Sequence, residues 1–124
     1  LPHLKQGGIF IFDVWFSPAV YTQKPETRVK RLQNSETKVV RIAEPELHHH
    51  INVVDVNYQF FIKNLETKQI EEFQEKHPMR HYSIPEIKYF AEKSNFRVLK
   101  TEEFLTGNAP SGNTWGVCFI LRKI

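Results

Sequence analysis

The stretch HLKQGGIFIFDVWF, His3 to Phe16, decides the fold. Two glycines precede four consecutive apolar residues, Ile9 to Phe12, in which apolar and polar side chains do not alternate. This pattern is typical of a strand at the centre of a parallel sheet that helices cover on both faces. Gly7 can supply the left-handed cap of a preceding helix, and Gly8 the sharp entry into the strand. We therefore predict that Leu1 to Gln6 ends a helix and that a strand buried on both faces follows.

The composition fits one soluble globular domain. The chain has 124 residues, of which 40% are hydrophobic and 25% are charged. Its apolar runs are far shorter than the ~20 residues that cross a bilayer. Cys118 is the only cysteine, so no disulfide can form within the chain, and its apolar neighbours indicate a core residue of a protein from a reducing compartment. We expect a cytoplasmic protein without a membrane segment.

The net charge is mildly positive. It is +3 at pH 7, and the basic residues gather mainly between Lys24 and Arg41. Such a patch can attract phosphorylated ligands. The basic residues do not alternate with aromatic residues that could stack on bases, so a nucleic-acid partner is not expected and remains only a third hypothesis.

Residues 28–76 predict an antiparallel meander of three or four strands. From Asn52 to Ile62, apolar and polar side chains alternate, as in a strand with one wet face. A shorter strand, Lys38 to Ile42, precedes it, and Gln69 to Lys76 is the next strand. Turns are predicted at Gln33-Asn34-Ser35, at Glu44-Pro45-Glu46 and from Lys63 to Thr67.

Residues 83–124 predict a helix and two strands. Ser83 and Glu86 form a capping box at the start of the helix. Asn95 can end this helix in the left-handed conformation. The two strands and the exposed turn-rich loop between them are Phe96 to Phe104, Trp115 to Lys123 and Thr106 to Asn113.

These segments resemble the C-terminal half of a class I S-adenosylmethionine-dependent methyltransferase. LKQGGIFIFD (4–13) resembles the end of the family's fourth helix and its fifth strand, and SIPEIKYFAEKSNFRVL (83–99) resembles the following helix and sixth strand. WGVCFILRK (115–123) resembles the final antiparallel strand, which inserts between strands five and six. Asn95 stands where the family usually has glycine. The resemblance covers essentially the whole chain.

The resemblance implies an α/β fold. The chain would be one partial domain, 1–124, from the C-terminal half of a Rossmann-like sheet: strands five to seven and one helix, with an inserted meander. Its parts would be a helix end and buried strand (1–16), the meander (28–76), and a helix with two terminal strands (83–124). The layout is most similar to small-molecule methyltransferases of the group that includes nucleotide-sugar N,N-dimethyltransferases, which carry an antiparallel insertion after strand five.

The resemblance also implies S-adenosylmethionine as the cofactor. The family binds it mainly through the first strand, a glycine-rich turn and an acidic residue after the second strand, all of which would precede Leu1. We therefore expect no cofactor-binding residue in this chain, which would be a cut or naturally truncated piece and inactive alone. Without that half, strand five would keep an open edge, and open edges favour pairing with another chain. A homodimer or a strand-paired oligomer is expected.

The implied function is transfer of a methyl group to a small molecule, with an amino sugar or another nitrogen or oxygen acceptor as substrate. The alternative is a non-catalytic module for dimerisation or ligand binding, in which the meander is the binding surface. Fold-level analogy does not choose between these two functions.

Asp13 and Trp15 follow the buried strand, at the end where α/β sheets bind ligands. A carboxylate there could accept hydrogen bonds from a substrate amine or hydroxyl, and an indole could stack on a ring or contact the sulfonium. Alternatively, Asp13 caps the loop and Trp15 packs under the meander. Tyr21, in the predicted loop after them, is a further candidate for substrate binding.

Four further candidates lie on the passage from the last meander strand into the capped helix. His77 and His81 are candidate general bases, because histidine titrates near neutral pH. Arg80 could bind a substrate phosphate or carboxylate through its guanidinium fork, and Tyr82 could contact the substrate. The alternatives are solvated histidines and an ion pair of Arg80 with Glu75 or Glu86.

The triplet His48-His49-His50 suggests a metal site at first sight. Three adjacent residues on a turn cannot all point at one ion, and no carboxylate or cysteine accompanies them at the usual ligand spacing. We predict a solvated hairpin loop and no metal. Cys118 has no adjacent histidine or basic pair that would lower its pKa, so we do not expect it to be a nucleophile.

Overall fold

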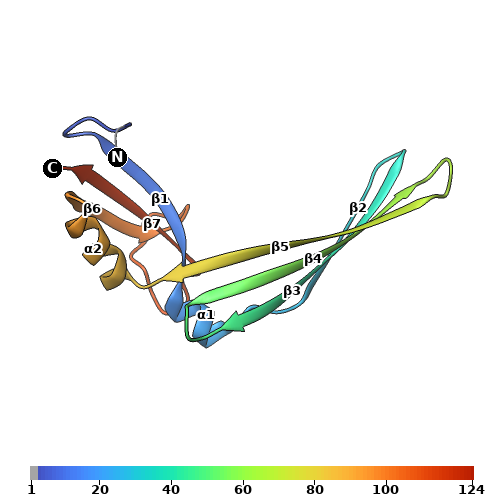
Figure 1. Ribbon diagram of the computed structural model, residues 1–124, viewed down its shortest axis with the longest axis horizontal. Coiled ribbons are helices and arrows are strands. Elements are labelled where there is room, and N and C mark those ends of the chain that lie inside the picture. Colours follow the sequence, from blue (N-terminus) through green and yellow to red (C-terminus); the bar gives the residue numbers. More distant parts are fainter. Residues whose placement is uncertain (1–2) are drawn as a thin grey trace. The chain divides into compact units, whose positions relative to one another are not determined.

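The computed structural model describes residues 3–124, which form a mixed α/β fold with a seven-stranded sheet and two helices (Figure 1). The elements are β1 (Ile9–Phe16), α1 (Ser17–Gln23), β2 (Arg28–Gln33), β3 (Thr37–His48), β4 (Val53–Asn64), β5 (Ile70–Tyr82), α2 (Ile84–Lys93), β6 (Phe96–Glu103) and β7 (Gly116–Lys123). Hydrogen-bonded neighbours follow the order β2-β3-β4-β5-β1-β7-β6. Within residues 3–124, no helix is long and apolar enough to cross a membrane.

The chain divides into two compact units. Unit 1 combines the residues up to Lys24 with Arg80–Ile124, and unit 2 is Pro25–Met79. Unit 2 contains the segment predicted as a meander, whereas unit 1 contains the segments that precede and follow it. Strand β5 contributes residues to both units.

In unit 1, β7 lies between β1 and β6 and runs antiparallel to both. This placement confirms the prediction that the last strand inserts between the two parallel ones. Ile11 pairs with Ile120 on one side of β7, and Thr101 pairs with Phe119 on the other. The end of β5 pairs with β1 in parallel, with Trp15 opposite His81.

The core of unit 1 lies between α2 and one face of this sheet. Ile87 and Ala91 of α2 are buried in it, and Phe119 of β7 is 1% exposed. The ring of Phe119 stacks on that of Phe12, with the ring centroids 5.6 Å apart. The buried members of the cluster are Phe16, Ile87, Ala91, Phe96, Val117, Phe119 and Leu121.

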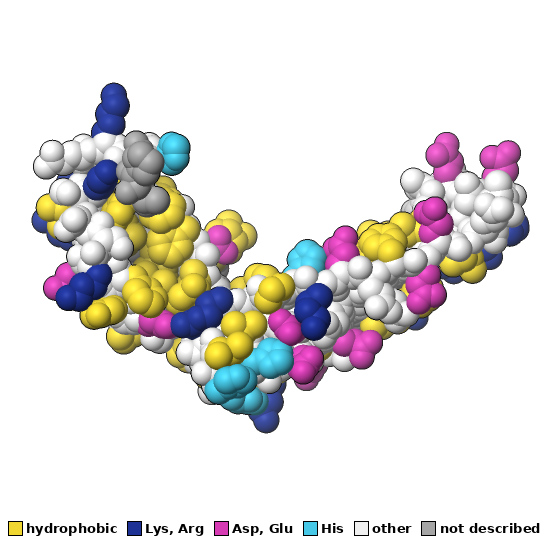
Figure 2. Space-filling view, in the orientation of Figure 1, with side chains coloured by type: hydrophobic (Ala, Val, Ile, Leu, Met, Phe, Trp, Pro, Cys, Tyr) yellow, Lys and Arg dark blue, Asp and Glu magenta, His cyan; other side chains and the backbone are white. Residues whose placement is uncertain are grey.

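The prediction that β1 is buried on both faces is wrong for the part of the chain that the structure describes. Ile9 and Ile11 are 42% and 60% exposed, and Phe10 is 40% exposed. Alternate residues of a strand point to opposite faces, and α2 covers only the face that carries Phe12. Hydrophobic side chains gather over β1 in the view of Figure 2. The apolar run therefore reflects an apolar sheet face that no described helix covers.

The segment before β1 forms turns in place of the predicted helix end. The amide of Gly8 donates to the carbonyl of Lys5 at 2.9 Å, and Gly7 has the predicted positive φ of 78°. A Cβ on Gly8 would lie 2.8 Å from that same carbonyl oxygen, so this close approach requires glycine. Leu1 and Pro2 lie outside the described residues.

Helix α1 is an element that the sequence did not predict. It spans only seven residues, with a proline in its first turn and no side-chain cap. The segment reads as a loop because it follows an apolar strand without a capping signal. As a result, Tyr21 lies on a helix and not in a loop.

Helix α2 begins as predicted, but only half of the capping box forms. The Ser83 hydroxyl accepts from the Glu86 amide at 3.4 Å. The Glu86 carboxylate pairs instead with Arg80, because the guanidinium is a charged partner. Asn95 follows the helix with φ of 60°, in the predicted left-handed conformation.

Unit 2 is built from antiparallel pairing of β2 with β3 and of β3 with β4, as predicted for the meander. Two turns form where expected: the Asn34 side chain accepts from the amides of Glu36 and Thr37, and Asn64 makes the same type of turn. The predicted turn at 44–46 is wrong, because β3 continues through it. Pro45 is tolerated there because the pairing with β2 ends at Ala43.

Strand β5 is longer than predicted and ends at Tyr82, not at Lys76. The four candidate residues that were placed on a connecting loop therefore lie on a strand. The reason is non-local: the last residues of β5 pair in parallel with β1, so that Phe16 lies opposite Tyr82. Composition alone does not reveal this pairing, since His77 and Pro78 suggest a loop.

Candidate functional site

Three strands of unit 1 end at one edge of the sheet. Strands β5 and β1 are parallel, and β6 is also parallel to β1 because β7 is antiparallel to both. Their last residues are Tyr82, Phe16 and Glu103. Open α/β sheets bind ligands at the carboxyl ends of their strands. We call this region, with the segments that leave it, the carboxyl edge of unit 1.

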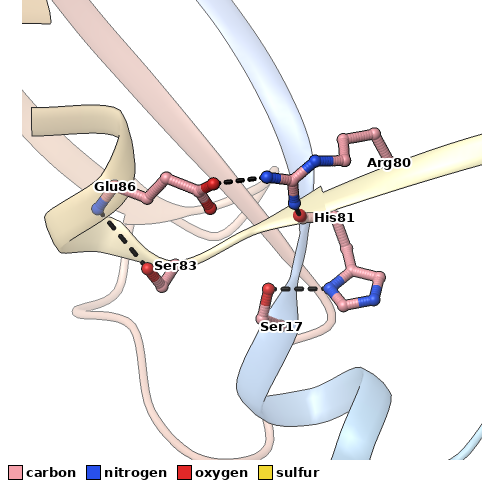
Figure 3. Close-up of polar contacts among 5 residues, drawn as sticks. All are labelled: Ser17, Arg80, His81, Ser83 and Glu86. Carbon is pink, nitrogen blue, oxygen red and sulfur yellow. Dashed lines mark hydrogen bonds and ion pairs between the residues drawn. The ribbon is translucent and has the colours of Figure 1, made fainter. Parts of the chain in front are cut away.

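A buried hydrogen bond joins Ser17 and His81 at this edge. The Ser17 Oγ lies 2.7 Å from His81 Nδ1 (Figure 3), and the two residues are 8% and 1% exposed. The edge of the Tyr21 ring meets the imidazole, with the ring centroids 5.1 Å apart. The pair thus connects the end of β5 to the start of α1.

The environment of His81 favours its neutral form. Burial lowers the pKa of His81 below its ordinary value of 6.5, and the positive charge of Arg80 lowers it further, whereas Glu86 acts in the opposite direction. Near pH 7 the imidazole is therefore neutral. A neutral imidazole has one nitrogen that donates and one that accepts, so in the tautomer in which Nδ1 donates to Ser17, Nε2 is the nitrogen that can take up a proton.

The guanidinium of Arg80 already has protein partners. It pairs with the Glu86 carboxylate and donates to the carbonyl of His81 (Figure 3), and it lies over the ring of Tyr82, 4.5 Å from the centroid. Of the alternatives considered for Arg80, the structure contains the ion pair with Glu86. These contacts connect the end of β5 to the first turn of α2.

Trp15 packs against the other tryptophan of the chain. Its ring centroid lies 5.6 Å from that of Trp115, and the Trp115 carbonyl accepts from the amide of Phe16 at 2.8 Å. Trp15 is half-buried, at the carboxyl end of β1. Aromatic surface is therefore concentrated where β1 ends and β7 begins.

Asp13 lies one step back from the edge, on the face of β1 that carries Ile11. It is exposed and pairs with Cys118 across the β1–β7 ladder. Burial raises the pKa of the Cys118 thiol, and the carboxylates of Glu102 and Asp13 raise it further. Cys118 is therefore a protonated thiol near neutral pH, not a nucleophilic thiolate.

Sequence reasoning missed two groups at this edge. These groups are Ser17 and Glu103. The Glu103 carboxylate holds the loop between β6 and β7, because it accepts hydrogen bonds from the hydroxyls of Thr114 at 2.6 Å and Thr106 at 3.0 Å. Thr114 is 1% exposed. The only available signal was position, since Ser17 directly follows β1 and Glu103 is the last residue of β6.

His77 belongs to unit 2. It is exposed, its Nε2 lies 2.9 Å from a carboxylate oxygen of Glu75, and its ring meets the edge of Tyr58. Unit 2 also has a cavity of about 410 Å³, which is lined by Glu44, Asn57, Tyr58, Gln59, Gln74, Glu75 and Lys76.

Of the predicted site residues, the structure brings Trp15, Tyr21, His81, Arg80 and Tyr82 to the carboxyl edge of unit 1.

Solved structures match nearly the whole chain, whereas no family model and no curated protein matches it. An S-adenosylmethionine-dependent methyltransferase from Clostridium acetobutylicum matches with a TM-score of 0.77 and 20% identity, over 98% of this chain and 47% of that one. CalS10, an amino pentose methyltransferase from Micromonospora echinaspora solved with S-adenosylmethionine, matches with a TM-score of 0.69 and 14% identity, over 99% of this chain and 47% of that one. The sugar N-methyltransferase KedS8 from Streptoalloteichus matches with a TM-score of 0.72 and 13% identity, over 99% of this chain and 45% of that one.

These matches confirm the fold that the resemblance implied. The chain has the Rossmann-like fold of S-adenosylmethionine-dependent methyltransferases, including the antiparallel last strand. It spans about half the length of the chains that it matches.

The lowered pKa of His81 predicts a dependence of stability on pH. As the pH falls below about 6.5, the unfolded chain takes up a proton at His81 before the folded chain does. The free energy of unfolding should therefore be greatest above this pH and decrease below it, by at most about 1.4 kcal/mol per pH unit. Urea unfolding followed by circular dichroism between about pH 5 and pH 8 measures this dependence. The variant His81→Gln should lose it.

His49→Gln is the matched control, because His49 is exposed on a turn of unit 2. It should retain the pH dependence of the original chain. If the free energy of unfolding depends equally on pH in the original chain and in His81→Gln, the dependence does not come from His81.

Proposed function

We propose that the chain is the substrate-side half of an S-adenosylmethionine-dependent methyltransferase that acts on a small molecule, with an amino sugar as the first acceptor class to test. The observation that supports this proposal is the antiparallel β7 between β1 and β6, which leaves three parallel strands ending at one edge. Two of the matched proteins, CalS10 and KedS8, act on sugars. Other nitrogen or oxygen acceptors stay within the proposal.

In this proposal the cofactor is bound mainly by a region outside this chain. The chain has no glycine-rich GxGxxG turn after a strand, and it spans less than half of each matched methyltransferase that is named above. The exposed face of β1, with Ile9 and Ile11, is apolar enough to receive further elements of an α/β fold. The chain by itself would then be inactive.

Methyl transfer to an amine is an in-line displacement. The nitrogen lone pair forms the new bond to the methyl carbon while the bond from sulfur to that carbon breaks, so positive charge moves from sulfur to nitrogen. The nitrogen then releases a proton. Such a reaction depends mainly on alignment of the two reactants, and a base contributes to it when the acceptor must lose its proton.

The carboxyl edge of unit 1 offers groups for these tasks. Trp15 and Tyr21 present aromatic rings, whose faces attract cations. Asp13, further back along β1, carries an exposed carboxylate that can accept from an amine or hydroxyl. Tyr82 adds a fourth substrate contact beside Arg80, whose charge is already balanced by Glu86. To bind a substrate anion, Arg80 would have to release the Glu86 carboxylate and pair with the anion in its place.

His81 is the first candidate for the base. Its lowered pKa keeps the imidazole neutral, which is the form that accepts a proton. Because the ring is buried, the acceptor would have to approach it through Ser17 or beside Tyr21. His77 is the second candidate, and its Nε2 lies beside a carboxylate oxygen of Glu75.

The proposal predicts where the cofactor binds. Calorimetric titration with S-adenosylhomocysteine, the demethylated product, should give no binding to this chain. A longer chain that adds about 100–130 upstream residues, one more α/β half, should bind it. Because these residues would carry the glycine-rich turn, a Gly→Ala change in that turn is the matched control. If the longer chain also fails to bind, the methyltransferase proposal is lost.

The proposal also predicts which histidine acts as base. In the longer, cofactor-binding chain, His81→Gln should lower kcat about 10²-fold or more at neutral pH, the usual contribution of a general base. His77→Gln should have a small effect, and His3→Gln, an exposed histidine outside the site, serves as control. If neither His81→Gln nor His77→Gln lowers kcat, the base role is excluded and alignment alone accounts for the reaction.

A non-catalytic assembly module is the second candidate function. The observation in its favour is that β2, at one edge of the sheet, exposes Val29 and Leu32, which are 48% and 55% exposed. Edge strands with apolar side chains tend to pair with another chain.

This candidate predicts self-association into a dimer or larger oligomer. Size-exclusion chromatography with light scattering at micromolar concentration should give a mass above 14.7 kDa. Leu32→Glu should shift the population toward monomer, whereas Leu105→Glu, in an exposed loop, should not. A monomer for the unchanged chain would exclude the module.

A further inference from the structure

Three potential metal ligands converge on one face of unit 2. Glu46 lies directly opposite Asp55 in the β3–β4 ladder, and His48 lies two residues beyond Glu46 on the same strand. Residues two apart on a strand share a face, and opposite residues on paired strands are neighbours. The antiparallel pairing therefore adds Asp55 to Glu46 and His48, which already share one face of β3.

The ligand atoms are already close together. Nε2 of His48 lies 2.9 Å from Oδ2 of Asp55 and 4.0 Å from Oε1 of Glu46. One ligand atom from each residue lies within 4.8 Å of the other two. Around a tetrahedral zinc ion with bonds of about 2.0–2.2 Å, ligand atoms lie roughly 3.3 Å apart. Small side-chain rotations would therefore place all three atoms around one ion.

Burial and charge at this site also suit a cation. The side chains of Asp55 and His48 are 15% and 28% exposed, so their interaction with an ion is only partly screened by solvent. Two carboxylates carry the negative charge. The opposing charge is Lys76, whose Nζ lies 3.7 Å from Asp55 and whose side chain is 60% exposed. Its flexible stem can carry the ammonium away when an ion binds.

We propose that Glu46, His48 and Asp55 bind a divalent transition-metal ion of the zinc class. An imidazole nitrogen with two carboxylate oxygens favours such ions over magnesium and calcium, which prefer oxygen ligands alone. Three protein ligands leave a coordination position for water or for an external group. The ion would bridge β3 and β4 next to the turn that joins them (Figure 1).

Calorimetric titration of the chelator-treated chain with zinc chloride tests this site. One zinc ion should bind per chain with a dissociation constant below about 100 μM, and magnesium should bind more weakly. Asp55→Asn and His48→Gln should each weaken zinc binding about tenfold or more, because each removes a ligand. Lys76→Gln should tighten it, because the competing ammonium is gone.

His49→Gln is the matched control, because it removes a histidine of the same triplet that is outside the cluster. It should change zinc binding by less than about twofold. Zinc should also raise the thermal unfolding temperature of the original chain but not that of Asp55→Asn, and unfolding in chelator checks that each variant folds. Absence of saturable binding, or binding that Asp55→Asn leaves unchanged, would overturn the site. The second result would assign zinc to the exposed triplet.

Discussion

The position of β7 is the constraint on which unit 1 depends. Because β7 runs antiparallel between β1 and β6, it makes these two strands parallel to each other although they are not hydrogen-bonded neighbours. It also supplies Val117, Phe119 and Leu121, three of the most buried side chains of the core. One strand thus fixes both the packing against α2 and the edge at which the candidate residues meet.

Local features of the fold were predictable from the sequence, because their causes are local. The Ser83 cap, the left-handed Asn95 and the alternation along β4 each depend on a few neighbouring residues. The order of β1, β7 and β6 was predictable only through the family resemblance. The exposure of Ile11 could not be predicted, since an apolar run is equally compatible with two covered faces and with one bare apolar face.

The candidate site was predictable as a list of residues and not as a set of contacts. Ser17 and His81 are 64 positions apart in the sequence, and only the parallel pairing of β5 with β1 brings them together. The same limit applies to His48, whose carboxylate partner lies on the next strand. Its contact with Asp55 depends on the register of the hairpin, which composition does not reveal.

The two tryptophans give the carboxyl edge of unit 1 an intrinsic optical probe. The chain contains only Trp15 and Trp115, and their rings pack together at this edge. Indole emission responds to the polarity around the ring, and closely packed indoles couple their electronic transitions. The tryptophan fluorescence of the protein therefore originates from this one edge, so a molecule that binds there would change this signal without any added label.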